Sequence, residues 1–217
     1  MTIQKFLHSC ILLEKNEKRL LIDPGTFSFI EKKFTPEDIG PVDIILLTHE
    51  HGDHFFPDAL KKIITLNKPV IFTHQRLSKL CAENDIESNI IKSEETISQD
   101  GFIITGLEAP HEKVVTETPH NIGFIIDGKI IHPGDSLSFT ATSPEVLFAP
   151  ITAPWLNEPD ALACVRRVKP KITIPIHDAF VKDFFLQGMY NRWETALKDI
   201  DSQFKPLILG ASLEISD

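Results

Sequence analysis

Residues 44–54 constrain the fold more than any other part of the chain, because an apolar run leads directly into a cluster of histidines. The run Ile-Ile-Leu-Leu predicts a buried strand, and the loop after it supplies His49, His51, Asp53 and His54. Alternate residues of an extended segment point the same way, so His49 and His51 can face one metal ion. Asp53 and His54 can then turn toward another. A solvated surface loop is the alternative, and it is disfavoured because imidazole and carboxylate donors at this spacing suit zinc.

Three further candidate ligands occupy one kind of position, the first loop residues after a short apolar run. They are His111, Asp135 and His177. Open sheets place their binding sites at the ends of buried strands, so these side chains are expected to belong to the same site.

Short apolar runs rich in β-branched residues predict strands, and longer runs with helical spacing predict helices. The expected strands are residues 2–7, 10–13, 20–22, 42–47, 69–73, 101–107, 121–127, 129–132, 146–151, 172–176 and 204–209. The expected helices are residues 57–65, 75–83, 158–168 and 181–200. A β-rich run followed by β/α units occurs twice. This order predicts an α/β protein with two sheets face to face and helices outside, a four-layer αββα sandwich formed by one domain, residues 1–217.

The charge balance narrows the choice of partner. Lys and Arg total 22 against 31 Asp and Glu, a net charge of -9, which repels phosphate backbones and argues against nucleic acid. The first ten residues resemble neither a signal peptide nor a membrane span, so we expect a cytoplasmic protein without a membrane partner. Cys10, Cys81 and Cys164 are unpaired in spacing and are expected to be reduced, packed thiols.

The ordered set of motifs resembles the metallo-β-lactamase superfamily, and the resemblance covers nearly the whole chain. Its hallmark His-x-His-x-Asp-His runs from His49 to His54, and it is accompanied by Asp23 before Pro-Gly, by His111, by Gly-Asp135 and by Pro-Ile-His177. The resemblance implies one metal held by His49, His51 and His111. It implies a second metal held by Asp53, His54 and His177, with Asp135 bridging the two.

The same resemblance implies two divalent metal ions. Zinc is the favoured metal, and Mn²⁺ or Fe is the alternative. A hydroxide shared by two such ions is available near neutral pH, and the ions polarise the oxygen of a carbonyl or phosphoryl group. Asp53 is then both ligand and catalytic residue, because it can accept a hydrogen bond from the attacking water. Asp23 is expected to orient a ligand loop, with a purely local turn as the alternative.

Other histidines and one tryptophan leave alternatives open. His8 resembles a motif of the ascorbate-6-phosphate lactonase-like branch, and lining the pocket or lying on the surface are both open to it. His120 and His132 can touch substrate, although polar strand ends explain them better. His74 fits a helix cap or the rim of a pocket, and Trp155 fits the pocket wall or the core.

Departures from better-defined relatives favour a zinc-dependent hydrolase of a small molecule. Asp135 stands where true β-lactamases have cysteine, and His51 stands where flavodiiron-like members have glutamate. We also expect the chain to be without the added regions of the glyoxalase II-like and RNA-processing members, because only forty residues follow His177. The leading hypothesis is a metal-bridged hydroxide that attacks a lactone or related ester. A phosphodiesterase on the same metal pair and a non-catalytic metal- or ligand-binding module are the alternatives.

The association state is open in the sequence. The apolar residues 27–30 and the pair Phe184-Phe185 can form an interface in a homo-oligomer, and core packing explains them equally well.

Overall fold

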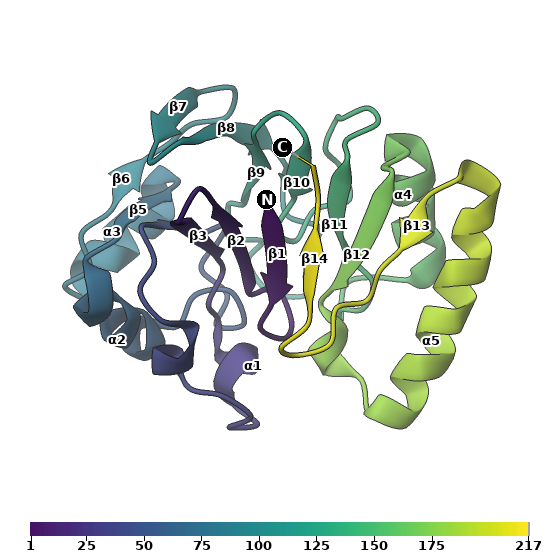
Figure 1. Cartoon of the computed structure of the whole chain (residues 1–217), viewed down its shortest axis with the longest axis horizontal. Helices are drawn as coiled ribbons and strands as arrows, with labels where there is room; N and C mark the ends of the chain where they lie inside the picture. The colour runs from purple at the N-terminus through teal and green to yellow at the C-terminus, as the bar shows by residue number, and fades with distance from the viewer. Residues whose placement is uncertain (217) are drawn as a thin grey trace.

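The computed structural model describes residues 1–216 and consists of two seven-stranded sheets packed face to face. Helices cover the outer surface of each sheet (Figure 1). The predicted α/β four-layer sandwich is therefore confirmed.

The first sheet is mixed, with antiparallel pairing at one side and parallel pairing at the other. In spatial order its strands are β14 (Ser212–Glu214), β1 (Thr2–Lys5), β2 (Ile11–Lys15), β3 (Lys18–Ile22), β4 (Ile44–Leu46), β5 (Val70–Thr73) and β6 (Asn89–Ile90). The helical segments in this part of the chain are α1 (Thr26–Phe29), the 3-10 turn η1 (Pro36–Ile39), α2 (Pro57–Asn67) and α3 (Gln75–Glu83).

The second sheet repeats this arrangement. In spatial order its strands are β13 (Gln203–Phe204), β12 (Ile172–Ile176), β11 (Val146–Pro150), β10 (Ile130–His132), β9 (Ile122–Ile126), β8 (Phe102–Glu108) and β7 (Thr96–Gln99). Its helical segments are α4 (Glu158–Val168), η2 (Asp178–Phe180), α5 (Asp183–Ala196) and η3 (Leu197–Ile200). Antiparallel pairing from β7 to β10 gives way to parallel pairing from β10 to β13. The repeated order of a β-rich run and β/α units is thus confirmed.

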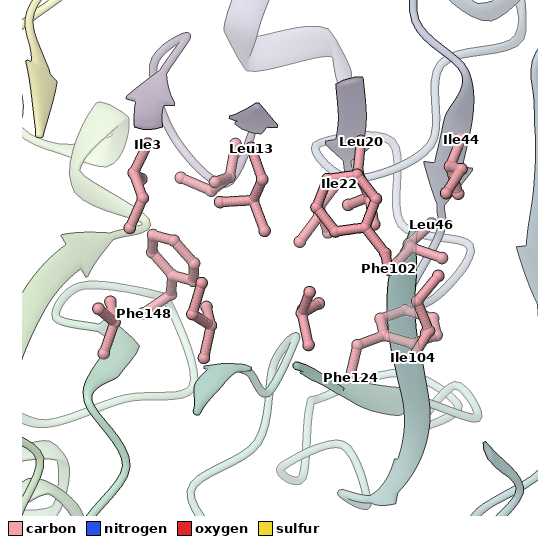
Figure 2. Packing of buried hydrophobic residues seen from close by; sticks show 14 of the residues in the cluster. Ile3, Leu13, Leu20, Ile22, Ile44, Leu46, Phe102, Ile104, Phe124 and Phe148 are labelled. Atoms are coloured by element: carbon pink, nitrogen blue, oxygen red, sulfur yellow. The ribbon is translucent and has the colours of Figure 1, made fainter. Parts of the chain in front are cut away.

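Strand alternation builds the core on both faces of each sheet. In β4, Ile44 and Leu46 point toward the second sheet, whereas Ile45 packs in the cluster that contains residues of α2 and α3. Burial on both faces explains why this strand is continuously apolar. Figure 2 shows the contact between the sheets, where Leu46 and its neighbours face side chains such as Phe102 and Phe124.

The turn that precedes β10 is set by two residues. Asp127 and Gly128 both have positive φ, at 51° and 67°, which is the conformation of a tight hairpin turn. β9 and β10 pair antiparallel on either side of it. The predicted Asp-Gly hairpin is confirmed, and it places β10 next to β9 in the middle of the second sheet.

The predicted strand over residues 204–209 is wrong for most of its length. Only Gln203–Phe204 pairs with β12, and a last backbone bond joins the Lys205 amide to Thr173. Pro206 has no amide hydrogen to donate, so the pairing ends there. The chain then crosses to the first sheet, where β14 pairs with β1 (Figure 1).

The predicted helix over residues 181–200 is divided and starts later than expected. A 3-10 turn over Asp178–Phe180 precedes it, the helix α5 begins at Asp183, and its end tightens into the 3-10 segment Leu197–Ile200. The short elements α1, β6, β7 and β14 were not predicted, because two to four residues are too few for a recognisable period.

Two further observations bear on the expectations from composition. Cys10, Cys81 and Cys164 are free and buried, as predicted. Among residues 1–216, no helix has both the length and the apolar character needed to cross a bilayer.

Candidate metal centre

The candidate ligands come from both sheets and meet at the ends of their strands. The loop after β4 carries His49 to His54, while His111, Asp135 and His177 follow β8, β10 and β12. His8 lies between β1 and β2. The structure therefore brings together all seven residues that the sequence motifs select, and it adds His8 to them.

The first group consists of His49, His51, His111 and Asp135, whose ligand atoms all lie within 4.8 Å of one another. His111 Nε2 is 3.3 Å from His51 Nδ1 and 3.4 Å from Asp135 Oδ2. His49 Nε2 is 3.8 Å from the same carboxylate oxygen. Ligand atoms this close to one another could share a single ion.

The second group consists of His8, Asp53, His54 and His177, again within 4.8 Å. His54 Nε2 lies 2.7 Å from His177 Nε2 and 3.9 Å from Asp53 Oδ2. His8 Nε2 lies 3.1 Å from Asp53 Oδ2. Because His8 is fully buried, the surface alternative for this residue is wrong.

Asp135 lies between the two groups and presents one oxygen to each. Its Oδ2 faces His49 and His111, at the distances given above. Its Oδ1 is 2.6 Å from His177 Nε2 and 3.0 Å from His54 Nε2. A carboxylate placed in this way can bridge two cations, which is the position that the family resemblance implies for Asp135.

A buried nitrogen without a hydrogen-bond partner tests whether a metal pair fits these residues. His49 Nε2 is buried, makes no hydrogen bond within the described protein, and lies 3.8 Å from Asp135 Oδ2. An unpaired buried polar atom is costly, so its place among the other candidate ligands indicates that it serves a ligand. The donor set of imidazole nitrogens and carboxylate oxygens suits divalent transition metals. The residues present therefore fit the two ions.

The protonation states of His49 and Asp135 favour coordination. Burial opposes the charged form of His54, yet Asp135 and Asp23 raise its pKa, so His54 would have to release a proton to a bound ion. Burial, together with the neighbouring His54, lowers the pKa of His49 well below its ordinary value, which leaves the imidazole neutral. Burial opposes ionisation of Asp135, yet His177 and His54 hold the pKa of its carboxyl well below the usual range. A neutral imidazole and a carboxylate are the forms that bind metal.

Asp23 contacts a ligand directly, although it lies in the loop after β3. Its Oδ2 is 2.7 Å from His54 Nδ1 and accepts a 2.6 Å hydrogen bond from Thr48 Oγ1. Its Oδ1 accepts a 2.8 Å hydrogen bond from the Thr48 amide. A proton on Nδ1 of His54 leaves Nε2 free to face the second group. A purely local turn would not make these contacts.

Close backbone approach explains the glycine that follows Asp23-Pro24. A Cβ atom on Gly25 would lie 1.8 Å from the backbone oxygen of Asp53. The ligand loop therefore passes directly over this residue, and only glycine leaves room for it.

A cleft of about 410 Å³ lies over the candidate ligands. Asp53, Asp135 and His51 line it, together with Trp155, Phe27 and Phe180. Trp155 Nε1 donates a 3.0 Å hydrogen bond to Asp135 Oδ2. Trp155 thus belongs to the pocket wall, the first of its two expected roles.

The remaining histidines lie elsewhere. His74 Nδ1 accepts a 3.4 Å hydrogen bond from the Leu77 amide at the start of α3, so it caps that helix, and its ring packs on His120. His132 is fully buried, with its nitrogens at the Ser9 carbonyl and the Gly134 amide.

The sequence analysis missed two residues that hold the site together. Thr48 links Asp23 to His49, whose Nδ1 is 3.0 Å from its hydroxyl. Asn121 donates to the carbonyls of Ala109 and Pro133, which ties the loop of His111 to the loop of Asp135. A polar residue at the junction of a buried strand and a loop is the signal that could have found both.

Comparison with known proteins agrees with this geometry. The sequence model of the beta-lactamase superfamily domain matches residues 2–177. Protein Rv0786c of Mycobacterium tuberculosis is 27% identical, over 95% of this chain and 97% of its own length. The UPF0173 metal-dependent hydrolase Ta0764 of Thermoplasma acidophilum is 31% identical, over 78% of this chain and 80% of its own.

A solved structure shares the fold. Igni18, described as a novel metallo hydrolase from the archaeon Ignicoccus hospitalis, superposes with a TM-score of 0.72 at 21% identity, over 99% of each chain. Two packed mixed sheets with adjacent His/Asp groups at their strand ends define an αββα sandwich protein with a candidate binuclear centre. Because the sequence model of this superfamily matches residues 2–177, the chain belongs to the metallo-β-lactamase superfamily.

Proposed function

We propose that this protein is a metal-dependent hydrolase that acts on a small molecule, namely a lactone or related ester. The proposed cofactor is a pair of divalent metal ions, of which zinc is the favoured one. The observation that carries the proposal is the position of Asp135, which offers one carboxylate oxygen to each of two groups of ligands. A metal pair would account for the position of both oxygens at once, because each oxygen faces a different group of ligands.

The metal pair, when bound, supplies a Lewis acid for the substrate oxygen and lowers the pKa of a water molecule. Asp53 provides a hydrogen-bond acceptor for that water. Burial opposes its ionisation, but the hydrogen bond with His8 and the charges of His54 and His177 hold the pKa of Asp53 well below its usual value. Its carboxylate lines the cleft, where it can accept a hydrogen bond from the attacking water and orient it.

The surrounding residues keep this acceptor and the ligands in place. His8 Nε2 holds Asp53 Oδ2, Asp23 holds His54, and Trp155 holds Asp135. Partners of this kind fix the orientation of a ligand and raise its affinity for metal. No serine or cysteine nucleophile is needed for this chemistry.

Charge at the cleft favours an ester over a phosphodiester. The residues that line the cleft include no lysine or arginine among those described. Arg76 pairs with Glu50 and Glu117, and Arg192 pairs with Glu158. A phosphodiester would gain from cationic side chains near its phosphate, so hydrolysis of this bond is the weaker alternative.

The first test measures metal content by elemental analysis, with and without zinc reconstitution, beside hydrolysis of a panel of lactones, esters and phosphodiesters. We expect about two ions per chain in the wild type and fewer in His51→Ala and Asp135→Ala. His120→Ala is the matched control, because this exposed histidine lies outside both ligand groups.

Hydrolysis of lactones or esters that disappears in the two ligand variants and persists in the control would support the proposal. Bound metal without turnover on any substrate would favour a non-catalytic binding module. Failure to bind metal after reconstitution would overturn the mechanism.

A further inference from the structure

A second cavity, of about 570 Å³, lies beside the metal cleft. It is enclosed by α1, by the first half of α5 and by the segment that crosses from β13 to β14, all at the lower end of the molecule in Figure 1. Its apolar wall consists of Leu7, Phe27, Phe180, Leu186, Leu207 and Leu209. The volume lies within the range of small-molecule sites in proteins.

Two aromatic side chains belong both to this cavity and to the metal cleft. Phe27 and Phe180 line both hollows, and their rings are 5.1 Å apart in an edge-to-face arrangement. Each ring also contacts His8, at 5.1 and 5.2 Å between centroids. Phe27 lies on the single-turn helix α1 and Phe180 on the 3-10 turn η2. The wall between the two hollows is therefore formed from short elements next to the ligands.

The polar side chains on the floor of the cavity pair with one another. Lys5 is buried, forms an ion pair with Asp178 and donates a 2.8 Å hydrogen bond to the Pro175 carbonyl. Tyr190 donates a 2.5 Å hydrogen bond to the same Asp178 carboxylate. The Lys5 ammonium and the Tyr190 hydroxyl thus already have acceptors.

The charges at the rim are balanced in the same way. Lys33 lies 2.5 Å from the Glu31 carboxylate, and Asp183 adds a negative charge. Among the described residues, every lysine of the cavity has a carboxylate partner, and no arginine lines it. An anionic ligand would find no unpaired cation there, whereas an uncharged apolar group would bury its surface against leucine and phenylalanine.

We propose that this cavity holds an uncharged apolar chain of the substrate, while the ester or lactone lies in the metal cleft on the other side of Phe27 and Phe180. This inference rests on the proposed function, which it deepens by naming the substrate class. The support for this occupant is that Phe27 and Phe180 line both hollows, so the cavity adjoins the cleft that holds the candidate ligands. A substrate that spans both hollows would lie along these two rings.

A second copy of the chain is the rival occupant, since Ile30 and Ile208 line the cavity and are 63% and 74% exposed. These two exposed side chains mark the solvent-facing mouth of the cavity. An interface between copies would cover them, whereas a substrate chain that reaches the cavity from the cleft would leave them exposed.

The test uses binding and turnover separately. Calorimetry with the uncharged alcohols from butanol to decanol, on zinc-loaded protein, probes the cavity without any reaction. Each buried methylene is expected to strengthen binding by about fourfold. Leu186→Trp fills the cavity from α5 and should abolish most of this dependence on chain length, whereas Leu66→Trp, on the exposed face of α2, should preserve it.

The same proteins are then assayed with esters of increasing acyl length. We expect kcat/KM to rise with acyl length in the wild type and to become flat in Leu186→Trp, with metal content unchanged. Leu66→Trp should keep both the length dependence and the turnover of the shortest ester. Ile208→Asp is a second variant that places a charge at the exposed mouth without disturbing the interior. It should weaken binding of decanol more than binding of butanol.

The outcomes separate the two proposals. Alcohol binding that depends on length and on Leu186, without hydrolysis of any ester, would support the cavity and overturn the proposed reaction. Ester hydrolysis with no dependence on length and no alcohol binding would overturn the cavity assignment alone. A dimer in sedimentation experiments that dissociates in Ile208→Asp, with no alcohol binding, would assign this face to a second copy and also overturn it.

Discussion

The indole Nε1 of Trp155 donates a 3.0 Å hydrogen bond to Asp135 Oδ2, the oxygen that faces His49 and His111. The bond joins the wall of the cleft to the carboxylate that lies between the two ligand groups. It comes from the loop after β11, so a residue outside every recognised motif sets the orientation of the central carboxylate.

Trp155→Phe should therefore weaken metal binding while it keeps an aromatic wall. Loss of one partner of a ligand typically lowers metal affinity by about 10- to 100-fold, and we expect the lower end because Asp135 keeps its histidine neighbours. Competition with a chromogenic chelator measures the affinity. Trp193→Phe, on the buried face of α5, is the matched control. Equal affinities in the two variants would show that the indole does not position Asp135.

Asp23→Asn tests the support of His54. The amide cannot reproduce both the charge and the acceptor at Oδ2, which holds His54 Nδ1 and the Thr48 hydroxyl. We expect a loss of metal affinity of about 10- to 100-fold with a smaller change in KM. Asp127→Asn, at a hairpin turn away from the ligands, is the control. If Asp23 acts only in a local turn, metal affinity will be unchanged and only the melting temperature will fall.

Gly25→Ala should destabilise the protein and displace the ligand loop. The added methyl group would lie 1.8 Å from the Asp53 carbonyl oxygen, so the backbone must move. Overpacking of this kind costs about 1–3 kcal/mol in the free energy of unfolding. Gly188→Ala is the control, and it should change the free energy of unfolding in the opposite direction. Gly188 lies within α5, and the nearest atom to an added Cβ is an Arg192 nitrogen at 3.8 Å. There, alanine should stabilise by up to about 1 kcal/mol.

Urea denaturation of both glycine variants, with and without zinc, measures these changes. The Gly25 variant should also bind less metal. Normal stability and normal metal content in Gly25→Ala would contradict the close approach of the two loops.

His74 should make the stability of the metal-free protein depend on pH. Burial lowers the pKa of His74 to about 3, with His120 and Arg76 contributing. The unfolded chain, with an ordinary histidine pKa near 6.5, binds more protons than the folded protein between these values. This contribution is therefore complete above about pH 6.5 and is lost as pH falls toward 3. The loss is at most about 1.4 kcal/mol per pH unit.

His74→Asn should reduce this pH dependence and keep a side-chain acceptor at the start of α3. Urea unfolding of chelator-treated protein at several acidic pH values measures the slope. His120→Asn should retain most of the slope, because burial is the largest cause of the low pKa of His74. Equal slopes in the wild type and His74→Asn would show that His74 does not control this transition.

The sequence by itself determined the two-sheet architecture and the order of most elements. Strand and helix periods are local, and β4 is apolar throughout because both of its faces are covered. The seven candidate ligands that the sequence motifs select also come together, because the loops that follow neighbouring strands meet at one end of the sandwich. Nothing local marked the crossing at residues 205–211, where the last segment leaves one sheet for the other.

Apart from Asp23, which the sequence motifs select, the residues that support the ligands were decided only by the tertiary structure. Trp155, Thr48 and Asn121 contact the site across long sequence separations, and such contacts have no period for a sequence pattern to reveal. The burial of His8 was equally undecided until β1 and β2 folded beside the ends of β4 and β12. Residue types and spacing select the atoms that can bind metal. Their orientation, their protonation and the neighbouring apolar cavity depend on packing between distant segments, which only the folded chain provides.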